Sequence, residues 1–229
     1  MKMKNYKNLK EVLETLPLGK KIMSDKVFRT LIFTAGSMSW NLIYGIFNGV
    51  LGIVYSSLWF AVMGLYYLIL GYMRFSIVAL QTKTHNEKKL RKTMYKDGIL
   101  LIILAFVLSG TVALCFILSV RKGYNKIIMI TIATYTFYNV VSSIRNIVIA
   151  HKEKSSILIA LRNISLAGAT ASILSLQRSM TATFGSGETD FANIMEGATG
   201  LAAFVIVFSL GILMIIRQIK SSKNNHNNF

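Results

Sequence analysis

Six apolar blocks, each close to or above the length that crosses a lipid bilayer, constrain the fold of this chain more than any other feature. They cover residues 28–53, 58–80, 98–120, 127–150, 156–176 and 194–216. Because a helix needs about 20 apolar residues to cross roughly 30 Å of hydrocarbon, each block is a candidate membrane span. The single proline, Pro17, precedes all six blocks. The sequence therefore predicts an all-α, polytopic membrane protein with six transmembrane helices arranged as three hairpins.

Composition and charge favour a membrane protein over a nucleic-acid-binding one. Hydrophobic residues make up 53% of the chain, which is too apolar for an ordinary soluble domain. The net charge is +17, but with the amino terminus inside the cell all but four of the 26 Lys and Arg lie on the cytoplasmic side. This positive-inside bias predicts that both termini are cytoplasmic. The basic loops also lack an aromatic-interleaved module, so we expect no nucleic acid as a partner.

The chain divides into three parts. Residues 1–27 form a basic, cytoplasmic segment that contains an apolar row at helical spacing. That row is Leu9, Val12, Leu13 and Leu16. We expect this segment to lie on the inner leaflet against anionic lipids, or else to dock a cytoplasmic partner. Residues 28–218 form the transmembrane domain, and the Asn-rich residues 219–229 are expected to be a disordered cytoplasmic tail.

The fourth block carries a row of polar residues at membrane depth. Its members, Thr134, Tyr138, Ser142 and Arg145, are spaced by four, four and three residues, so a helix stacks them on one face. Polar groups in hydrocarbon without partners cost several kcal/mol each, by a rough estimate. We therefore expect this face to lie against other helices or a wet cavity.

The first block repeats this arrangement with Asn41, Tyr44 and Asn48 on one helical face. Asparagines at membrane depth serve either as hydrogen-bonding links between helices or as part of a solute path, and the sequence leaves both roles open. Gly45 and Gly49 form a GxxxG pair, which favours close helix packing.

Tyrosine and arginine recur seven residues apart in the second and fourth blocks. Tyr67 precedes Arg74, as Tyr138 precedes Arg145, which indicates either a weak internal repeat or interfacial anchoring. With Arg162 of the fifth block, the two arginines are predicted to form a basic ring at the inner mouth of the bundle. The alternative is that all three extend to lipid phosphates.

Three acidic residues gather near the predicted outer end of the sixth block, within a chain that has only nine. They are Glu188, Asp190 and Glu196. The functional interpretation is an outer vestibule for cations; the plainer one is a soluble surface loop. The fifth block is rich in small residues and is expected to be central in the bundle.

A resemblance rests on three stretches of sequence. ISLAGATASILSLQRSMTATFG, MEGATGLAAF and YYLILGYMRF together resemble a family of small six-helix integral membrane proteins of Gram-positive bacteria, over roughly two thirds of the chain. The resemblance implies six helices and a bacterial plasma membrane. It implies no activity and carries over no functional residues.

Catalysis is not expected from this sequence. The nine acidic residues lie in loops or at predicted helix ends, and the three histidines are scattered on the cytoplasmic side. Paired carboxylates, an HExxH motif, a cysteine cluster and a P-loop do not occur in the sequence. We predict that the protein is not an enzyme and has neither a metal nor a cofactor.

Two functional classes remain. The first is a channel or facilitator for a small ion or solute, in which Arg74, Arg145 and Arg162 would give a preference for anions. Its path-lining residues would be Asn41, Tyr44, Asn48, Tyr67, Thr134, Tyr138 and Ser142. The second is a non-conducting accessory or solute-binding subunit that works through protein partners. In both classes we expect a homo-oligomer or a membrane protein partner, because so small a bundle has little interior.

Overall fold

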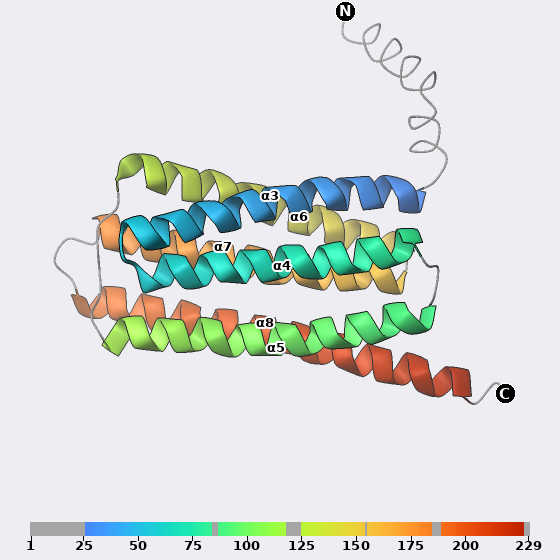
Figure 1. The fold of residues 1–229 in the computed structure, drawn as a ribbon. Helices are drawn as coiled ribbons and strands as arrows, with labels where there is room; N and C mark the ends of the chain where they lie inside the picture. The colour runs from blue at the N-terminus through green and yellow to red at the C-terminus, as the bar shows by residue number, and fades with distance from the viewer. Residues whose placement is uncertain (1–25, 84–86, 118–124, 154, 185–188, 227–229) are drawn as a thin grey trace, which may run out of the picture.

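The computed structural model describes residues 26–83, 87–117, 125–153, 155–184 and 189–226, which form six long helices. These are α3 (Lys26–Val54), α4 (Leu58–Lys83), α5 (Glu87–Ile117), α6 (Lys126–Glu153), α7 (Ser156–Phe184) and α8 (Thr189–His226). The helices run up and down alongside one another, so that α3 begins and α8 ends at the same end of the bundle (Figure 1). The described part of every predicted block lies within one helix; residues 118–120 of the third block lie outside the described residues.

Five of the helices, α4 to α8, are long and apolar enough to cross a membrane. Within α3 the structure describes a shorter apolar stretch, Met38–Val54. Three helices extend well beyond the predicted blocks, and one of them is α7, which continues past residue 176 to Phe184. α5 begins at Glu87 rather than at residue 98, and α8 continues through His226, so the tail expected to be disordered is helical as far as that residue. Lys, Arg and Glu are good helix formers, and no proline or glycine stops either extension.

The helices pack mainly in pairs. α3 lies along α4, α6 along α7, and α5 along α8. Of the three predicted hairpins, the α3–α4 pair is observed, whereas α6 pairs with α7 and α5 with α8, instead of α5 with α6 and α7 with α8. In the described residues α5 and α6 lie on opposite sides of the bundle (Figure 1). α7 packs against α4, α5, α6 and α8, which confirms the prediction that the small-residue block is central.

Glycines bring two of these pairs into close contact. A Cβ atom on Gly64 of α4 would lie 2.8 Å from the backbone nitrogen of Gly49 and 2.9 Å from the carbonyl oxygen of Gly45 on α3. On the other side of the bundle, a Cβ on Gly211 of α8 would lie 2.9 Å from the carbonyl oxygen of Gly98 on α5. Such distances leave room only for glycine at positions 64 and 211. The packing role predicted for the GxxxG pair is confirmed at Gly45, where a Cβ would lie 3.1 Å from the Leu68 side chain, whereas a Cβ on Gly49 would have no atom within 4 Å.

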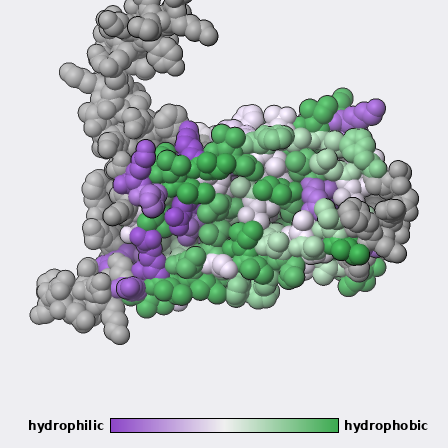
Figure 2. Space-filling model, turned by 180° about the vertical axis from the view of Figure 1, so that it is seen from behind, coloured by the Kyte–Doolittle hydropathy of each residue, from purple (hydrophilic) through white to green (hydrophobic). Residues whose placement is uncertain are grey.

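Charge and hydropathy separate along the bundle axis. Figure 2 shows an apolar surface over the middle of the bundle and hydrophilic residues gathered mainly at one end. At this end, named here the basic end, α5 begins and α6 and α8 terminate, with exposed Lys89, Lys92, Lys152 and Lys220. Among the basic side chains that the structure describes, those toward the opposite end are Lys126 and Arg178.

Candidate functional site

A cluster of buried polar side chains lies where α3, α4, α6 and α7 meet. Its members, named here the central cluster, are Asn41, Tyr44, Asn48, Tyr66, Tyr67, Arg74, Tyr135, Thr136, Asn139, Ser165, Ser172 and Ser175, and every one of them is buried. Four separate helices thus direct polar groups inward at a depth where the outer surface of the bundle is apolar. Convergence of this kind is what a polar path or a binding site inside a membrane bundle requires.

Tyrosine rings form the middle of the central cluster. The rings of Tyr44 and Tyr135 stack almost parallel, with centroids 3.3 Å apart. Tyr67 meets both rings edge-on, with centroids 5.0 Å from Tyr44 and 5.3 Å from Tyr135. These three ring contacts join α3, α4 and α6. α3 and α6 meet here through long side chains rather than through close packing of their backbones.

Hydrogen bonds link the same helices. The Tyr135 hydroxyl donates to Asn41 Oδ1 at 2.9 Å, joining α6 to α3. Thr136 Oγ1 lies 3.0 Å from the carbonyl oxygen of Ser172, joining α6 to α7. The Tyr66 hydroxyl donates to the carbonyl oxygen of Ala167 at 3.2 Å, joining α4 to α7.

The central cluster also holds buried groups that are not satisfied by hydrogen bonds. Asn41 Nδ2, the Tyr67 hydroxyl and Asn139 Nδ2 have no hydrogen-bond partner within the described part of the chain. The Tyr67 hydroxyl is close to Ser172, but without hydrogen-bond geometry. Leaving such a group without a hydrogen bond costs about 1–3 kcal/mol of stability, so binding a polar solute or water there is favourable.

Arg74 supplies the positive charge of the central cluster. Its side chain is 3% exposed, and Nη2 donates to Ser165 Oγ at 3.2 Å. Ser165 Oγ also accepts a hydrogen bond of 2.7 Å from Asn146 Nδ2 and donates to the carbonyl oxygen of Leu161. The sequences of α3, α4 and α7 contain no acidic residue, and α6 has one only at its last position, Glu153. The site is therefore electropositive and rich in hydrogen-bond donors.

The polar row predicted along α6 does not form one sheltered face. Ser142 is buried, but Thr134 and Arg145 are exposed and Tyr138 is 39% exposed. The prediction that Thr134 and Tyr138 face inward is wrong, because α6 carries a second polar row about 100° around the helix and that row is the buried one. The buried row is Tyr135, Thr136, Asn139, Ser142 and Ser143.

Local contacts of Thr134 and Tyr138 explain why these two side chains can be exposed. Thr134 Oγ1 donates to the carbonyl oxygen of Ile130 in its own helix at 2.9 Å, so it needs no partner elsewhere. Tyr138 packs edge-on against Trp40 of α3, with centroids 5.7 Å apart. Since Tyr67 is fully buried and Tyr138 is not, the two halves of the predicted internal repeat occupy different environments.

The three arginines predicted to form a basic ring also have different environments. Arg74 is buried in the central cluster, whereas Arg145 is exposed on the outer side of α6. Arg162 is partly buried and donates to Asn163 Oδ1 through Nε and Nη2, at 3.3 and 3.2 Å. Of the three, Arg74 is the one that the structure places in the central cluster.

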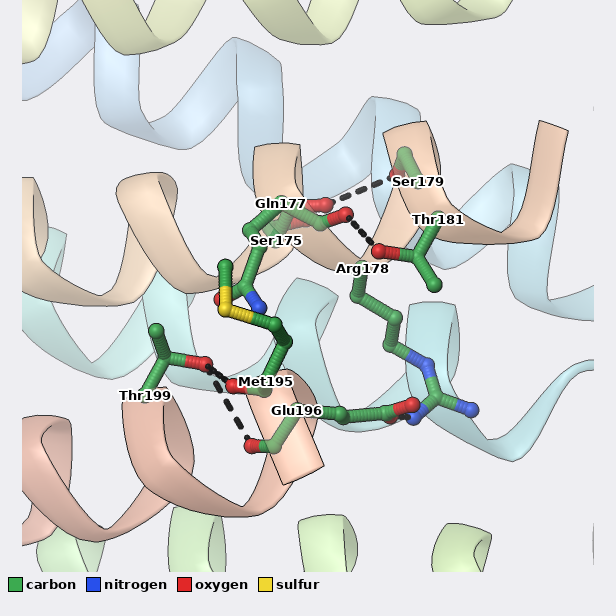
Figure 3. Close-up of polar contacts among 8 residues, drawn as sticks. All are labelled: Ser175, Gln177, Arg178, Ser179, Thr181, Met195, Glu196 and Thr199. Carbon is green, nitrogen blue, oxygen red and sulfur yellow. Dashed lines mark hydrogen bonds and ion pairs between the residues drawn. The ribbon is translucent and has the colours of Figure 1, made fainter. Parts of the chain in front are cut away.

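The acidic residues predicted to form an outer vestibule are only partly described. Glu188 and the side chain of Asp190 lie outside the described residues. Glu196 of α8 is buried and forms an ion pair with Arg178 of α7 (Figure 3). The Arg178 guanidinium lies 4.7 Å from the centre of the Trp59 ring on α4. Because its carboxylate is already paired, Glu196 connects helices rather than offering a free cation ligand.

The hydroxyls around this ion pair are satisfied locally. Figure 3 shows Ser179, Thr181 and Thr199 directing their hydroxyls back to carbonyl oxygens of their own helices, at 2.8, 3.0 and 2.7 Å. They reduce the polarity of the helix surface and leave the Arg178–Glu196 pair as the main polar contact there. Within the described ranges, no three His, Cys, Asp or Glu side chains group as metal ligands.

Sequence reasoning missed Tyr66, Tyr135, Thr136, Asn139, Ser165, Ser172 and Ser175 as members of the site. The sequence does contain one sign of the buried row on α6, because Tyr135, Asn139 and Ser143 are spaced by four residues. Thr134 and Tyr138 of the exposed row have the same spacing. Only the packing of α6 against α7 and α3 distinguishes the two rows.

Long apolar helices around a buried polar cluster define the class of this molecule, a helical multi-pass membrane protein. No protein-family model matches the chain, and no curated protein matches it either. Its function is therefore inferred from the central cluster.

Proposed function

We propose that this protein is a membrane transport protein, a channel or facilitator, that conducts a small anionic solute through the central cluster. The observation that carries the proposal is the convergence of buried polar side chains from α3, α4, α6 and α7 on one place. Helices that need polar groups only to hold together can satisfy them in isolated pairs. Here the groups are joined into one cluster, and some of them retain unused hydrogen-bonding capacity.

Arg74 is the reason for the anionic preference. A buried guanidinium surrounded by hydroxyls and amides, on helices almost free of carboxylates, attracts an anion and repels a cation. Ser165 links Arg74 to Asn146, and the Asn146 amide carries a second N–H group that is available to a solute. The path that we propose thus contains Asn41, Tyr44, Asn48, Tyr67 and Arg74 of the central cluster, together with Ser142, which is buried on α6.

The tyrosine contact accounts for a closed conformation of that path. Tyr44 and Tyr135 stack face to face between α3 and α6, and the Tyr135 hydroxyl is tied to Asn41. Since side chains rather than closely packed backbones join these two helices, rotation of the rings can open the contact without separating whole helices.

The proposal includes an orientation in the membrane. All six helices cross the bilayer, both termini are cytoplasmic, and the basic end faces the cytoplasm, where it contacts anionic lipids. Support comes from the distribution of the described basic side chains, which is strongly biased to that end. The exposed aromatic pair Trp40 and Tyr138 is a suitable contact for a second copy or a membrane partner.

Anion flux into proteoliposomes tests the proposal. We expect uptake of a panel of small inorganic and organic anions by the wild-type protein, and a reduction of about tenfold or more in the Arg74→Gln variant, because hydrogen bonds from a charged donor contribute about 1.5–3 kcal/mol. Arg145→Gln is the matched control, since Arg145 lies on the outer surface. It should leave flux within about twofold of wild type by the same reasoning.

A second function has its own supporting observation. Tyr135 with Asn41, Thr136 with Ser172, and Arg74 with Ser165 form helix-to-helix contacts that a non-conducting accessory subunit would also need. Absence of flux for every anion, cation and neutral solute tried, with the protein folded in the vesicles, would reject transport and leave this function. Equal flux in wild type and Arg74→Gln would reject the role of Arg74.

A further inference from the structure

A groove of about 550 Å³ lies between α4 and α5, apart from the central cluster. Ser76 of α4 and Thr93, Lys96 and Asp97 of α5 line one part of it, and Ile99 and Ile103 of α5 line another. Its volume is in the range of small-molecule sites. The groove therefore has a polar part and an apolar part, as a site for an amphiphile would.

The polar part lies where the hydrocarbon region of α5 begins. Basic residues follow one another along the first turns of α5 as far as Lys96, and after Asp97 the helix is apolar. Ile103 is six residues further on, which places it about 9 Å deeper along the helix axis. Ile99 and Ile103 are 40% and 51% exposed, so the apolar part opens toward the lipid chains.

Asp97 indicates which kind of ligand the groove would bind. The residue is 4% exposed, lines the groove, and has a buried Oδ2 with no hydrogen-bond partner in the part of the chain that the structure describes. A buried carboxylate without a donor is costly, and a positively charged donor with N–H groups is the partner that relieves this cost best. Lys96, next in the chain, provides an exposed ammonium that suits a phosphate.

We propose that the α4–α5 groove binds a phospholipid whose head group carries a primary amine. The lipid ammonium donates to Asp97, the phosphate lies against Lys96, and an acyl chain follows Ile99 and Ile103. One acidic and one basic side chain match the opposite charges of a zwitterionic head group, whereas a purely anionic head group would meet the Asp97 carboxylate unfavourably.

Native mass spectrometry of the purified protein, titrated with single lipids, tests this site. Phosphatidylethanolamine has three N–H donors on its nitrogen, and phosphatidylcholine has the same phosphate and chains but none. We expect wild type to bind phosphatidylethanolamine about tenfold more tightly, the ratio that one charge-assisted hydrogen bond supplies. Asp97→Asn should bring the two affinities together, and Lys96→Ala should weaken both lipids alike.

Lys92→Ala is the matched control, because Lys92 is exposed on α5 and does not line the groove. It should keep the wild-type affinities. Because the readout is the ratio of two affinities measured on the same protein preparation, a general loss of binding in a misfolded variant does not imitate the result. Equal affinity of wild type for the two lipids, no binding of either, or an unchanged preference in Asp97→Asn would overturn the proposal. If soluble phosphoethanolamine bound as tightly as the lipid, the groove would recognise the free phosphate–amine group and not a phospholipid.

Discussion

At the scale of single residues, the Arg178–Glu196 pair shows how a charged side chain is accommodated inside this bundle. Both residues are buried, they neutralise one another across α7 and α8, and the guanidinium rests on the Trp59 ring of α4. Removing one partner of such a pair leaves a buried charge without compensation, which is costly, whereas removing both is often tolerated.

Glu196→Gln is therefore expected to lower the free energy of unfolding by about 3 kcal/mol. Reversible unfolding in mixed micelles measures the change. The double variant Arg178→Met with Glu196→Met, which removes both charges and keeps apolar volume, should recover most of the loss. A single variant as stable as wild type would show that the pair contributes little.

The sequence indicated Glu196 as part of an acidic cluster but gave no sign of its partner. Arg178 is 18 positions earlier in the chain, just beyond the end of a different apolar block. Likewise, spacing predicted correctly that Asn41, Tyr44 and Asn48 share a face, because all three are on one helix. Spacing could not decide which of two polar rows on α6 is buried, since that depends on the neighbours of α6.

At the scale of helices, glycine contacts decide which helices pair. Gly45, Gly49 and Gly64 bring the backbones of α3 and α4 together, and Gly98 and Gly211 do so for α5 and α8. The Gly45–Gly49 pair could be predicted, because GxxxG within one helix is a local pattern. The second joins residues more than a hundred positions apart, so the sequence suggested instead that α5 would pack on its successor, α6.

Gly64→Val tests the first of these contacts. Its new side chain would meet the backbone of α3, so we expect a loss of about 1–3 kcal/mol in stability and a lower midpoint of thermal unfolding in detergent. Gly110→Val in α5 is the matched control, because no atom lies within 4 Å of a Cβ there. Equal midpoints for the two variants would contradict a packing role for Gly64.

At the scale of the whole molecule, the basic end determines the orientation that we propose. Lys126 and Lys152 are exposed at the two ends of α6, so they report on opposite sides of the membrane. The number and place of the apolar blocks and the bias of charge are properties that a sequence carries directly, which is why the six helices were predicted, although α5, α7 and α8 extend beyond the block limits. The same bias of Lys and Arg predicts which end of the bundle faces the cytoplasm.

Cysteine labelling in intact cells measures this orientation. On a Cys115→Ala background, Lys126→Cys should react with a membrane-impermeant maleimide, and Lys152→Cys should react only after the cells are opened. The reverse pattern would place the basic end outside and contradict the proposed topology. Reaction of both in intact cells would show that α6 does not cross the bilayer.

The uneven packing of the helices has a mechanical consequence. α3 and α4 are held together far more extensively than either is held to the remaining helices, and the contacts described between α3 and α6 include aromatic ring pairs and the Tyr135–Asn41 hydrogen bond. The α3–α4 pair is therefore fixed by contact between its backbones, whereas the α3–α6 contact can change by rotation of the Tyr44 and Tyr135 rings alone. Every close backbone contact within the pair would stay intact during such a change.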